Sequence, residues 1–261
     1  MKAFICNIYK MKCLKFAAAA ILALSLCFPV SAANWYCRHT TGGKVPDMPG
    51  EFAFLRDVGG FYLNEKAAES KEKVIYLTFD AGYENGNVEK ILDTLKEKEA
   101  PGAFFILSHV IEANGDLVRR MHDEGHLVCN HTANHKDMTG LSASEIEKEL
   151  STLEELCRSS LGFEMSKFYR PPEGKLDETS ARTASDLGYT AVMWSFAYAD
   201  WDNEDQPLAK AALEKIEIGV HPGEILLLHP TSATNAAILG TLIDKLREDG
   251  WRFGSLDELT Q

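Results

Sequence analysis

The sequence predicts an α/β protein whose parallel strands form a closed or nearly closed barrel. From Lys73 onward, apolar strand-like runs alternate with helical patterns about seven times, which favours a parallel sheet covered by helices. Short polar motifs follow most of these runs, and barrel enzymes carry their chemistry at the carboxyl ends of the strands. Gly82 and Gly86, after the first run, lack the spacing of a nucleotide-binding loop, which disfavours an open nucleotide-binding sheet.

The predicted strands are short apolar runs. Residues 74–79 are almost continuously apolar, as expected for a strand buried on both faces of a parallel sheet. Cys129 lies inside another such run and is expected to pack as a small hydrophobic residue. In chain order, strands are expected at residues 74–79, 103–107, 126–130, 168–169, 189–195, 224–228 and 251–253.

The predicted helices combine a helical apolar period with recognisable ends. Residues 88–99 place apolar side chains on one side and charges on the other. Residues 142–161 have the clearest start, because Ser142 can cap the helix and Glu145 completes a capping box. The remaining helices are expected at residues 114–125, 177–187, 207–218 and 234–248.

The first 32 residues have the pattern of a targeting segment. Four lysines form a basic region, residues 16–30 are apolar, and residues 30–32 supply a small-residue cleavage site. The apolar stretch, about 15 residues long, is shorter than the roughly 20 needed to span a bilayer. A cleaved signal peptide is therefore favoured over an uncleaved anchor. We expect a secreted or cell-wall protein that is monomeric and not inserted in the membrane.

The chain that remains is acidic and large enough for one core. It carries 23 basic and 39 acidic residues, a formal net charge of −16, which disfavours nucleic acid and anionic membranes as partners. Its three cysteines include no C-x-x-C pair, so no disulfide framework is expected, although a single bridge is left open. Residues 33–72, rich in Gly, Pro and aromatics, are expected to form an irregular extension packed on a main domain at residues 73–258.

Two histidines with metal-ligand spacing follow the third predicted strand. His131 and His135 are four residues apart, and such side chains face the same way on a helical turn. Two imidazoles so placed can bind one ion such as Zn²⁺. Asp80 follows the first predicted strand, where a carboxylate can act as a general base. Each residue alone also fits a cap, loop or surface position, so the prediction depends on the whole set meeting at one mouth.

The other strand ends supply an arginine, a carboxylate and a third histidine. Arg170 precedes two prolines, beginning with Pro171, that stiffen the loop, and an arginine so held can clamp a carboxylate. His229 can act as a general acid, and Asp200 can hold its imidazole and raise its pKa. The ordinary alternatives are a surface arginine, a core-edge histidine and a solvated loop carboxylate.

Aromatic residues gather near the same motifs, and such side chains suit stacking on sugar rings. They are Tyr83, Tyr169, Trp194, Tyr198 and Trp201. Each alone is more often a packing residue. The candidate substrate contacts are Tyr83, Tyr169, Pro171 and Trp201.

The ordered set of motifs resembles the polysaccharide deacetylase family, the NodB homology domain of carbohydrate esterase family 4. The resemblance covers roughly residues 73–258 and implies a distorted (β/α)₇ barrel. The string TFDAGYENG at residues 78–86, the RPPEG loop at residues 170–174 and the aromatic extension are similar to the muramic-acid deacetylase branch. That branch supplies the δ-lactam of spore-cortex peptidoglycan.

The resemblance implies a role for each matching residue. Asp80 corresponds to the base, His131 and His135 to the metal ligands, Arg170 to the arginine that orients the base, Asp200 to the aspartate that tunes the acid, and His229 to the acid. One position departs from the family pattern. The usual first motif has a second aspartate, a metal ligand, where this chain has Ala81. The ion is therefore expected to keep two protein nitrogens and several open positions.

The implied reaction is metal-assisted removal of the acetyl group from N-acetylmuramic acid in a peptidoglycan strand of a Gram-positive spore-former. Asp80 would deprotonate a water, a backbone N–H near Tyr169 or Arg170 would stabilise the oxyanion, and His229 would protonate the leaving amine. The expected cofactor is a divalent ion, Zn²⁺ in the first place. The alternatives are N-acetylglucosamine polymers or acetyl-xylan as substrate, and an inactive wall-binding module that has lost its third ligand.

Overall fold

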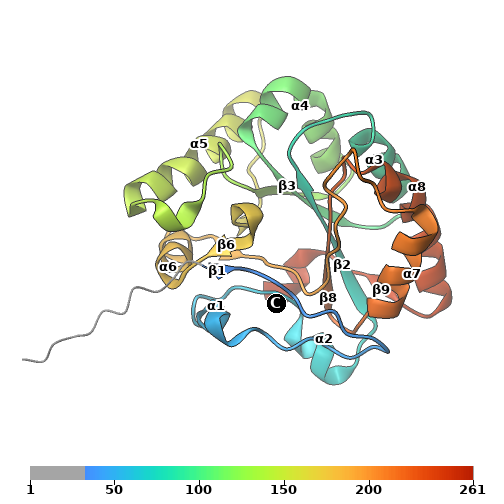
Figure 1. Ribbon diagram of the computed structural model, residues 1–261. Coiled ribbons are helices and arrows are strands. Elements are labelled where there is room, and N and C mark those ends of the chain that lie inside the picture. Colours follow the sequence, from blue (N-terminus) through green and yellow to red (C-terminus); the bar gives the residue numbers. More distant parts are fainter. Residues whose placement is uncertain (1–32, 261) are drawn as a thin grey trace, which may run out of the picture.

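The computed structural model describes residues 33–260 and contains a curled parallel sheet surrounded by helices (Figure 1). Among the described residues this sheet has seven strands in the order β7-β5-β4-β3-β2-β8, with β9 also paired to β2. The strands are β2 (Val74–Ala81), β3 (Gly102–Ile106), β4 (Leu127–Asn130), β5 (Phe168–Tyr169), β7 (Thr190–Ala191), β8 (Glu224–Leu228) and β9 (Arg252–Phe253). All of these pairings are parallel, so the predicted α/β barrel class is confirmed.

The strand expected at residues 189–195 is much shorter than predicted. β7 ends at Ala191 because its partner β5 ends at Tyr169, and the next residue, Val192, forms an isolated parallel bridge with Phe61 of the N-terminal region. An isolated parallel bridge between Phe196 and Leu226 then brings the chain beside β8, so the two margins of the sheet approach each other. The sheet therefore curls as a half-barrel whose gap is partly filled by the N-terminal region.

The helices cover the outside of the sheet, mostly where they were predicted. They are α3 (Val88–Glu97), α4 (Ser108–Asp123), α5 (Ala143–Leu161), α6 (Glu178–Asp186), α7 (Ala209–Gly219) and α8 (Ala233–Glu248). The capping box of α5 is confirmed, because the Ser142 N–H donates to Glu145 Oε2 at 2.8 Å. The helix expected from residue 114 begins six residues earlier. A kink at Asn114, with φ −137°, divides α4 at the predicted start.

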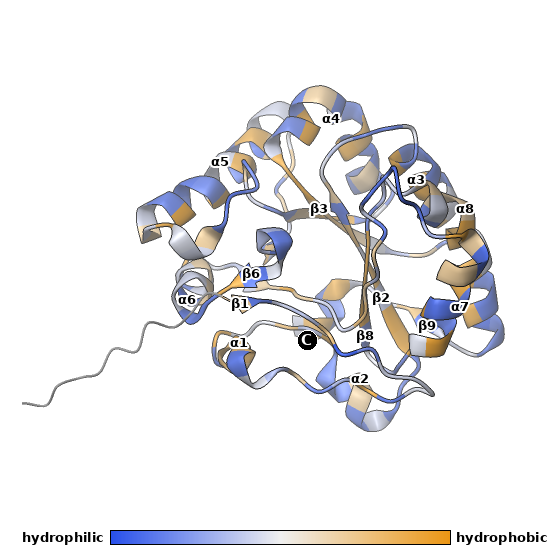
Figure 2. Cartoon of the chain, in the orientation of Figure 1, coloured by the Kyte–Doolittle hydropathy of each residue, from blue (hydrophilic) through white to orange (hydrophobic). Residues whose placement is uncertain are grey.

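The core lies between the strands and these helices, as Figure 2 shows by the apolar colour of the central strands. Phe79 and Phe104 stack there across β2 and β3 with ring centroids 4.8 Å apart. Burial of each such ring stabilises the fold by roughly 1.5–3 kcal/mol. Cys129 is fully buried, as predicted from its apolar run.

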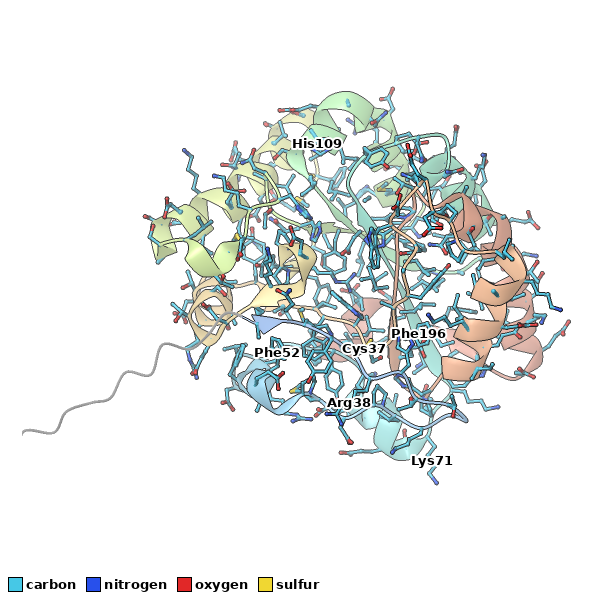
Figure 3. The ribbon with its side chains drawn as sticks, in the orientation of Figure 1. Cys37, Arg38, Phe52, Lys71, His109 and Phe196 are labelled. Carbon is cyan, nitrogen blue, oxygen red and sulfur yellow. The ribbon has the colours of Figure 1, made fainter. Side chains whose placement is uncertain are left out.

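Residues 33–72 are more ordered than the irregular extension that the composition predicted. They contain β1 (Ala33–Asn34), a 3₁₀ turn (Gly50–Phe52), α1 (Phe54–Asp57) and α2 (Glu65–Ser70). These elements are hard to recognise in the sequence because β1 has only two residues and each helix has only one or two turns, among many glycines and prolines. Figure 3 contrasts Phe52, which is buried, with Lys71, which projects outward after α2.

The N-terminal region is attached to segments that follow much later in the chain. β1 pairs antiparallel with β6 (Lys175–Leu176), and the Trp35 indole N–H donates to the carbonyl of Trp194 at 2.9 Å. Trp35 also packs edge-on against Phe52, with centroids 5.0 Å apart.

Within residues 33–260 no helix combines the length and apolar character that a membrane crossing requires. The predicted leader, residues 1–32, lies outside the described residues.

Candidate active site

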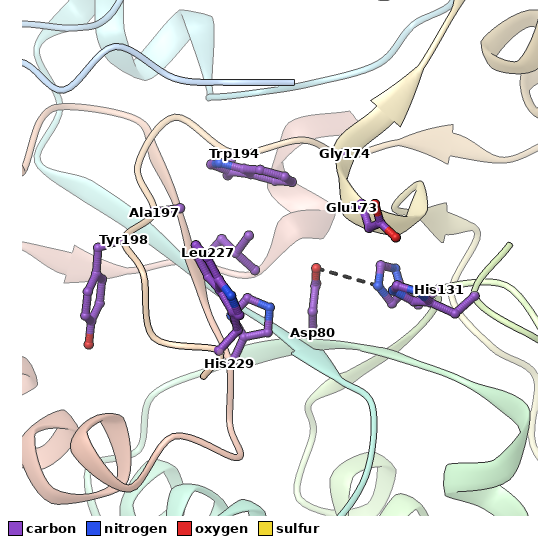
Figure 4. Close-up of a pocket in the computed structure, with 11 residues that line it drawn as sticks. Asp80, His131, Glu173, Gly174, Trp194, Ala197, Tyr198, Leu227 and His229 are labelled. Atoms are coloured by element: carbon purple, nitrogen blue, oxygen red, sulfur yellow. Dashed lines mark ion pairs between the residues drawn. The ribbon is translucent and has the colours of Figure 1, made fainter. Parts of the chain in front are cut away.

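The strand-end motifs meet around one pocket at the carboxyl end of the sheet. The pocket has a volume of about 480 Å³, and Asp80, His131, His135, Trp201 and His229 contribute to its wall. Figure 4 shows Asp80 between His229 on one side and His131 on the other. The structure thus brings together the predicted base, both predicted metal ligands and the predicted acid.

Arg170 lies beneath the pocket and holds Asp80. Its side chain is 0% exposed, and its Nη1 donates to Asp80 Oδ1 at 2.8 Å. The remaining donors reach Thr78 Oγ1 and the carbonyls of Val192 and Met193, while the guanidinium covers the Phe105 ring. A buried guanidinium whose three nitrogens each donate a hydrogen bond within the protein is fixed in place. Arg170 therefore fixes the orientation of the Asp80 carboxylate.

Asp80 is kept ionised by this environment. Burial alone would raise the pKa of its carboxyl group, but the Arg170 guanidinium and the nearby imidazoles outweigh burial and hold that pKa below its usual range. With Oδ1 bound to Arg170, the second oxygen, Oδ2, is left near the pocket, 3.8 Å from His131 Nε2.

His131 presents one defined nitrogen to the pocket. Its Nδ1 lies 2.9 Å from the carbonyl of Arg170, and because a carbonyl only accepts, Nδ1 carries the proton. Burial lowers the pKa of the ring to about 4, so the imidazole is neutral near pH 7. Nε2 therefore offers a free lone pair, which is the state that metal ligation requires.

The turn that carries His135 is not helical, and the helical-turn prediction was wrong. Thr132 and His135 adopt left-handed backbone conformations, with φ of 73° and 55°. The turn is held by hydrogen bonds from Thr132 N–H to Asn130 Oδ1 and from His135 N–H to Thr132 Oγ1. The imidazoles of His131 and His135 still meet, with centroids 5.1 Å apart. Positive φ in a β-branched residue costs on the order of 1–3 kcal/mol and is typical of functional sites.

The donor set fits a divalent ion held by two imidazole nitrogens. Within residues 33–260 no cluster of three or more His, Cys, Asp or Glu side chains is arranged to hold a metal. Ala81 is buried and supplies a methyl group where an oxygen ligand would be needed. The neutral His131 and its neighbour His135 match the preference of Zn²⁺ for nitrogen and leave several coordination positions open.

His229 and Asp200 form a second, tightly bonded pair in the same site. His229 Nδ1 lies 2.7 Å from Asp200 Oδ1, and the backbone N–H of His229 donates to Asp200 Oδ2 at 2.8 Å. Burial alone would lower the pKa of His229, but the hydrogen bond and charge of Asp200 outweigh it and raise that pKa. The ring therefore favours the protonated form, with Nε2 as the remaining donor.

The predicted substrate contacts separate into two groups. Trp201, 61% exposed, lines the pocket, and Tyr83 is exposed and bonded to the side chain of Asn203. Tyr169 and Pro171 are buried, and neither side chain lines the pocket. The N–H of Arg170 donates to the Asn130 carbonyl, so this N–H, one of the two expected oxyanion donors, already has a partner.

Sequence reasoning missed Glu173 as a pocket residue. Its φ is 55°, and its carboxylate lies 2.9 Å from Lys175 Nζ at the pocket wall. The two prolines before it were the available signal, because they restrict the loop but do not specify a left-handed residue. Trp194 and Tyr198, noted only as neighbouring aromatics, also line the pocket.

Comparison with known proteins gives one consistent result. A family model described as polysaccharide deacetylase matches residues 67–192. The chain is 36% identical to the peptidoglycan-N-acetylmuramic acid deacetylase PdaA of Bacillus subtilis, over 88% of this chain and 87% of that protein. The solved structure of that family 4 carbohydrate esterase matches with a TM-score of 0.83, covering 89% of this chain and 98% of its own.

Two further solved structures come from Bacillus anthracis. A family 4 carbohydrate esterase is 38% identical, with a TM-score of 0.72 and coverage of 90% of this chain and 99% of that chain. A protein described as a pseudoenzyme of the same family is 26% identical, with a TM-score of 0.67 over 72% of this chain and 66% of its own.

Proposed function

The chain belongs to the polysaccharide deacetylase family, and from that premise we propose that it removes the N-acetyl group from N-acetylmuramic acid in peptidoglycan. One observation carries the proposal. Asp80 and His229 line the same pocket, and their separate partners, Arg170 and Asp200, favour an ionised carboxylate and a protonated imidazole. Amide hydrolysis needs this combination of a base and an acid.

Asp80 is proposed as the base. Its carboxylate is ionised, one oxygen is tied to Arg170, and the other can accept the proton of a water that attacks the acetyl carbonyl. Arg170 acts by orienting Asp80, because each of its three side-chain nitrogens already donates a hydrogen bond within the protein.

His229 is proposed as the acid. Its Nδ1 is occupied by Asp200, so the proton on Nε2 is the one available to the amine that departs as acetate is released. Asp200 stabilises the imidazolium before transfer and fixes the ring orientation throughout.

His131 and His135 are proposed as the protein ligands of a divalent ion, Zn²⁺ in the first place. When bound, such an ion supplies Lewis acidity toward the carbonyl and lowers the pKa of a water. The contribution of the chain is the neutral Nε2 of His131, which is oriented by the Arg170 carbonyl.

The substrate assignment rests on the relatives and on the pocket wall. Trp201 is exposed and Trp194 lies on the pocket wall, as suits stacking against the sugar rings of a glycan strand. PdaA, which resembles this chain over most of both lengths, is named for N-acetylmuramic acid. We extend the proposal to a secreted enzyme with a catalytic domain at residues 73–258, whose product amine leads to the muramic δ-lactam of spore cortex.

Mass spectrometry of glycan fragments tests this proposal. Peptide-stripped muramyl glycans and chitooligosaccharides are incubated with the enzyme, with and without a chelator, and with the His229→Ala variant as the matched control. We expect loss of one acetyl mass from muramic acid, abolished by the variant and reduced by the chelator. Acetate release from chitooligosaccharides alone would replace the muramic assignment with a glucosamine one.

A wall-binding module without activity is the remaining alternative, because Ala81 supplies no ligand. Calorimetry with Zn²⁺ separates the two. We expect binding that is lost in His131→Ala. No binding to the unaltered protein, together with no deacetylation of any glycan, would favour the module.

A further inference from the structure

We propose that Asn235 is a positioning residue of the active site, whose side-chain amide clamps Asp200 against His229. The proposal deepens the proposed function, since it assumes that His229 is the acid. Asn235 lies in the first turn of α8, is 0% exposed, and follows the Ser232 cap of that helix. Neither the strand-end motifs nor the likeness to known proteins assigns it a role.

The amide of Asn235 contacts both members of the pair. Its Nδ2 donates to Asp200 Oδ2 at 2.6 Å and to the backbone carbonyl of His229 at 3.0 Å. Both amide hydrogens are thereby used. A single side chain therefore ties the loop that carries Asp200 to the end of β8.

Tyr198 fixes which way this amide points. The Tyr198 hydroxyl donates to Asn235 Oδ1. A reversed amide would set its oxygen against the Asp200 carboxylate and leave the Tyr198 proton facing an NH₂ group. The observed orientation is therefore the one that satisfies all three residues.

The consequence for Asp200 is a carboxylate held at both oxygens. Oδ2 accepts from Asn235 and from the His229 backbone N–H, and Oδ1 accepts from His229 Nδ1. Because Asp200 is only 1% exposed, water cannot replace a lost donor. The clamped carboxylate keeps the proton of neutral His229 on Nδ1 and keeps Nε2 directed into the pocket.

Asn235 is not needed to cap its own helix. Capping at this end uses the backbone N–H of Asn235, which donates to Ser232 Oγ at 3.1 Å. The loop backbone is held separately, because Gln206 Nε2 donates to the carbonyl of Asp200. The side-chain amide is thus left with one task, which is to orient the Asp200–His229 pair.

Two variants and a matched control test the proposal. Asn235→Leu keeps the volume and removes the donor, and Asn235→Asp restores a donor only when the new carboxyl group is protonated. Asn64→Ala is the control, because Asn64 also stands at a helix start and donates to a tyrosine hydroxyl, Tyr76, away from the pocket. The ring nitrogens of His229 are followed by NMR, which needs no substrate, and kcat and KM are measured by acetate release.

In Asn235→Leu we expect His229 to populate both neutral tautomers and kcat to fall by on the order of tenfold or more, with KM within about twofold. In Asn235→Asp, activity relative to the unaltered enzyme should recover as pH falls. Asn64→Ala should lose stability without changing the His229 tautomer. If Asn235→Leu does not fold, Tyr198→Phe, which frees the amide to turn, is expected to mix the tautomers.

A single Nδ1–H tautomer in Asn235→Leu or in Tyr198→Phe, with kcat within twofold, would overturn the proposal. Its failure is distinguishable from failure of the proposed function. If the unaltered protein deacetylates no glycan but Asn235→Leu changes the His229 tautomer, the role of Asn235 is supported and the proposed function is rejected. If the unaltered protein is active but neither Asn235→Leu nor Tyr198→Phe changes the His229 tautomer, the proposed function is supported and the role of Asn235 is rejected.

Discussion

Strand β8 carries a histidine–carboxylate pair at each end, and the two pairs behave oppositely. At the carboxyl end, His229 and Asp200 are 2.7 Å apart and the pKa of His229 is raised. At the amino end, His221 and Glu224 are 3.7 Å apart and fully buried. There burial lowers the pKa of His221 to about 4 and raises that of Glu224 well above its usual value. The surroundings of the first pair favour the charged form of His229, and those of the second favour the neutral forms of His221 and Glu224.

The difference comes from the donors that each carboxylate receives. Asp200 accepts hydrogen bonds from two groups of His229 and from Asn235. Among the described contacts, Glu224 accepts a hydrogen bond only from the backbone N–H of His221. Its Oε1 and the Nε2 of His221 have no hydrogen-bond partner among the described residues. Burial of a carboxylate favours its neutral form unless hydrogen bonds stabilise the charge. Residue type and burial therefore do not by themselves make a histidine an acid catalyst.

Asp200→Asn makes the first pair resemble the second and should have the largest effect. An amide carries no charge to stabilise the imidazolium, so kcat is expected to fall about 10²–10⁴-fold. Acetate release measures the loss, and a thermal melt checks that the variant is folded. A kcat within tenfold of the unaltered enzyme would show that Asp200 does not support the acid.

Ala81→Asp tests the proposed role of His131. Like His221 this histidine is buried with a lowered pKa, but it is proposed as a metal ligand. The added carboxylate would lie at the end of β2, next in sequence to Asp80. We expect the affinity for Zn²⁺ to rise at least about tenfold, measured by calorimetry. The Ala81→Asn variant is the matched control, because it adds similar volume without charge. An unchanged affinity in Ala81→Asp would place the ion elsewhere.

The pH profile of the unaltered enzyme sharpens the comparison further. Because the pKa of His229 is raised above 6.5, the protonated acid persists above that pH and activity is lost only as pH rises through the raised pKa. The alkaline limb of kcat/KM against pH should therefore lie above 6.5. Asp200→Asn should move this alkaline limb to lower pH. If the limb does not move, a group other than His229 is responsible for it.

Glu224→Gln probes the neutral pair and should have the smallest effect. The pKa of Glu224 is higher in the folded than in the unfolded state, so its protonation favours folding at low pH. That contribution is lost as pH rises through the raised pKa. The variant should match the unaltered Tm below pH 4.5 and exceed it by roughly 2–4 °C under alkaline conditions. Activity should stay within twofold, and a catalytic loss would give this pair a role in the site.

The strand-end residues could be predicted because their positions follow from local patterns. The apolar run before Asp80 and the run before His229 coincide with β2 and β8, whose burial depends on composition alone. Parallel pairing then brings the ends of these strands together. The capping box of α5 was equally visible, because both of its partners lie within one helical turn.

The remainder depends on partners that are distant in the sequence. The turn between His131 and His135 is held partly by Glu149, within α5, which accepts from the backbone N–H of Asn134. β7 is short because its partner β5 ends at Tyr169, and the residue after β7, Val192, bridges to Phe61, about 130 positions earlier in the chain. In the sequence, Asn235 is only a polar residue in the first turn of a predicted helix. Its role depends on Asp200 and Tyr198, which contact its side chain in the structure.

The hydrogen bond between Trp35 and Trp194 links the start of the described chain to the wall of the pocket. Trp35 leaves the ribosome before nearly all of the domain, yet its hydrogen-bond partner follows 159 residues later. Closing so long a loop has a larger entropic cost than closing a short one, which slows the formation of such a contact. Trp35 itself does not line the pocket, but its indole holds the backbone of Trp194, which does. A segment near the start of the described chain therefore supports a pocket residue that is synthesised much later.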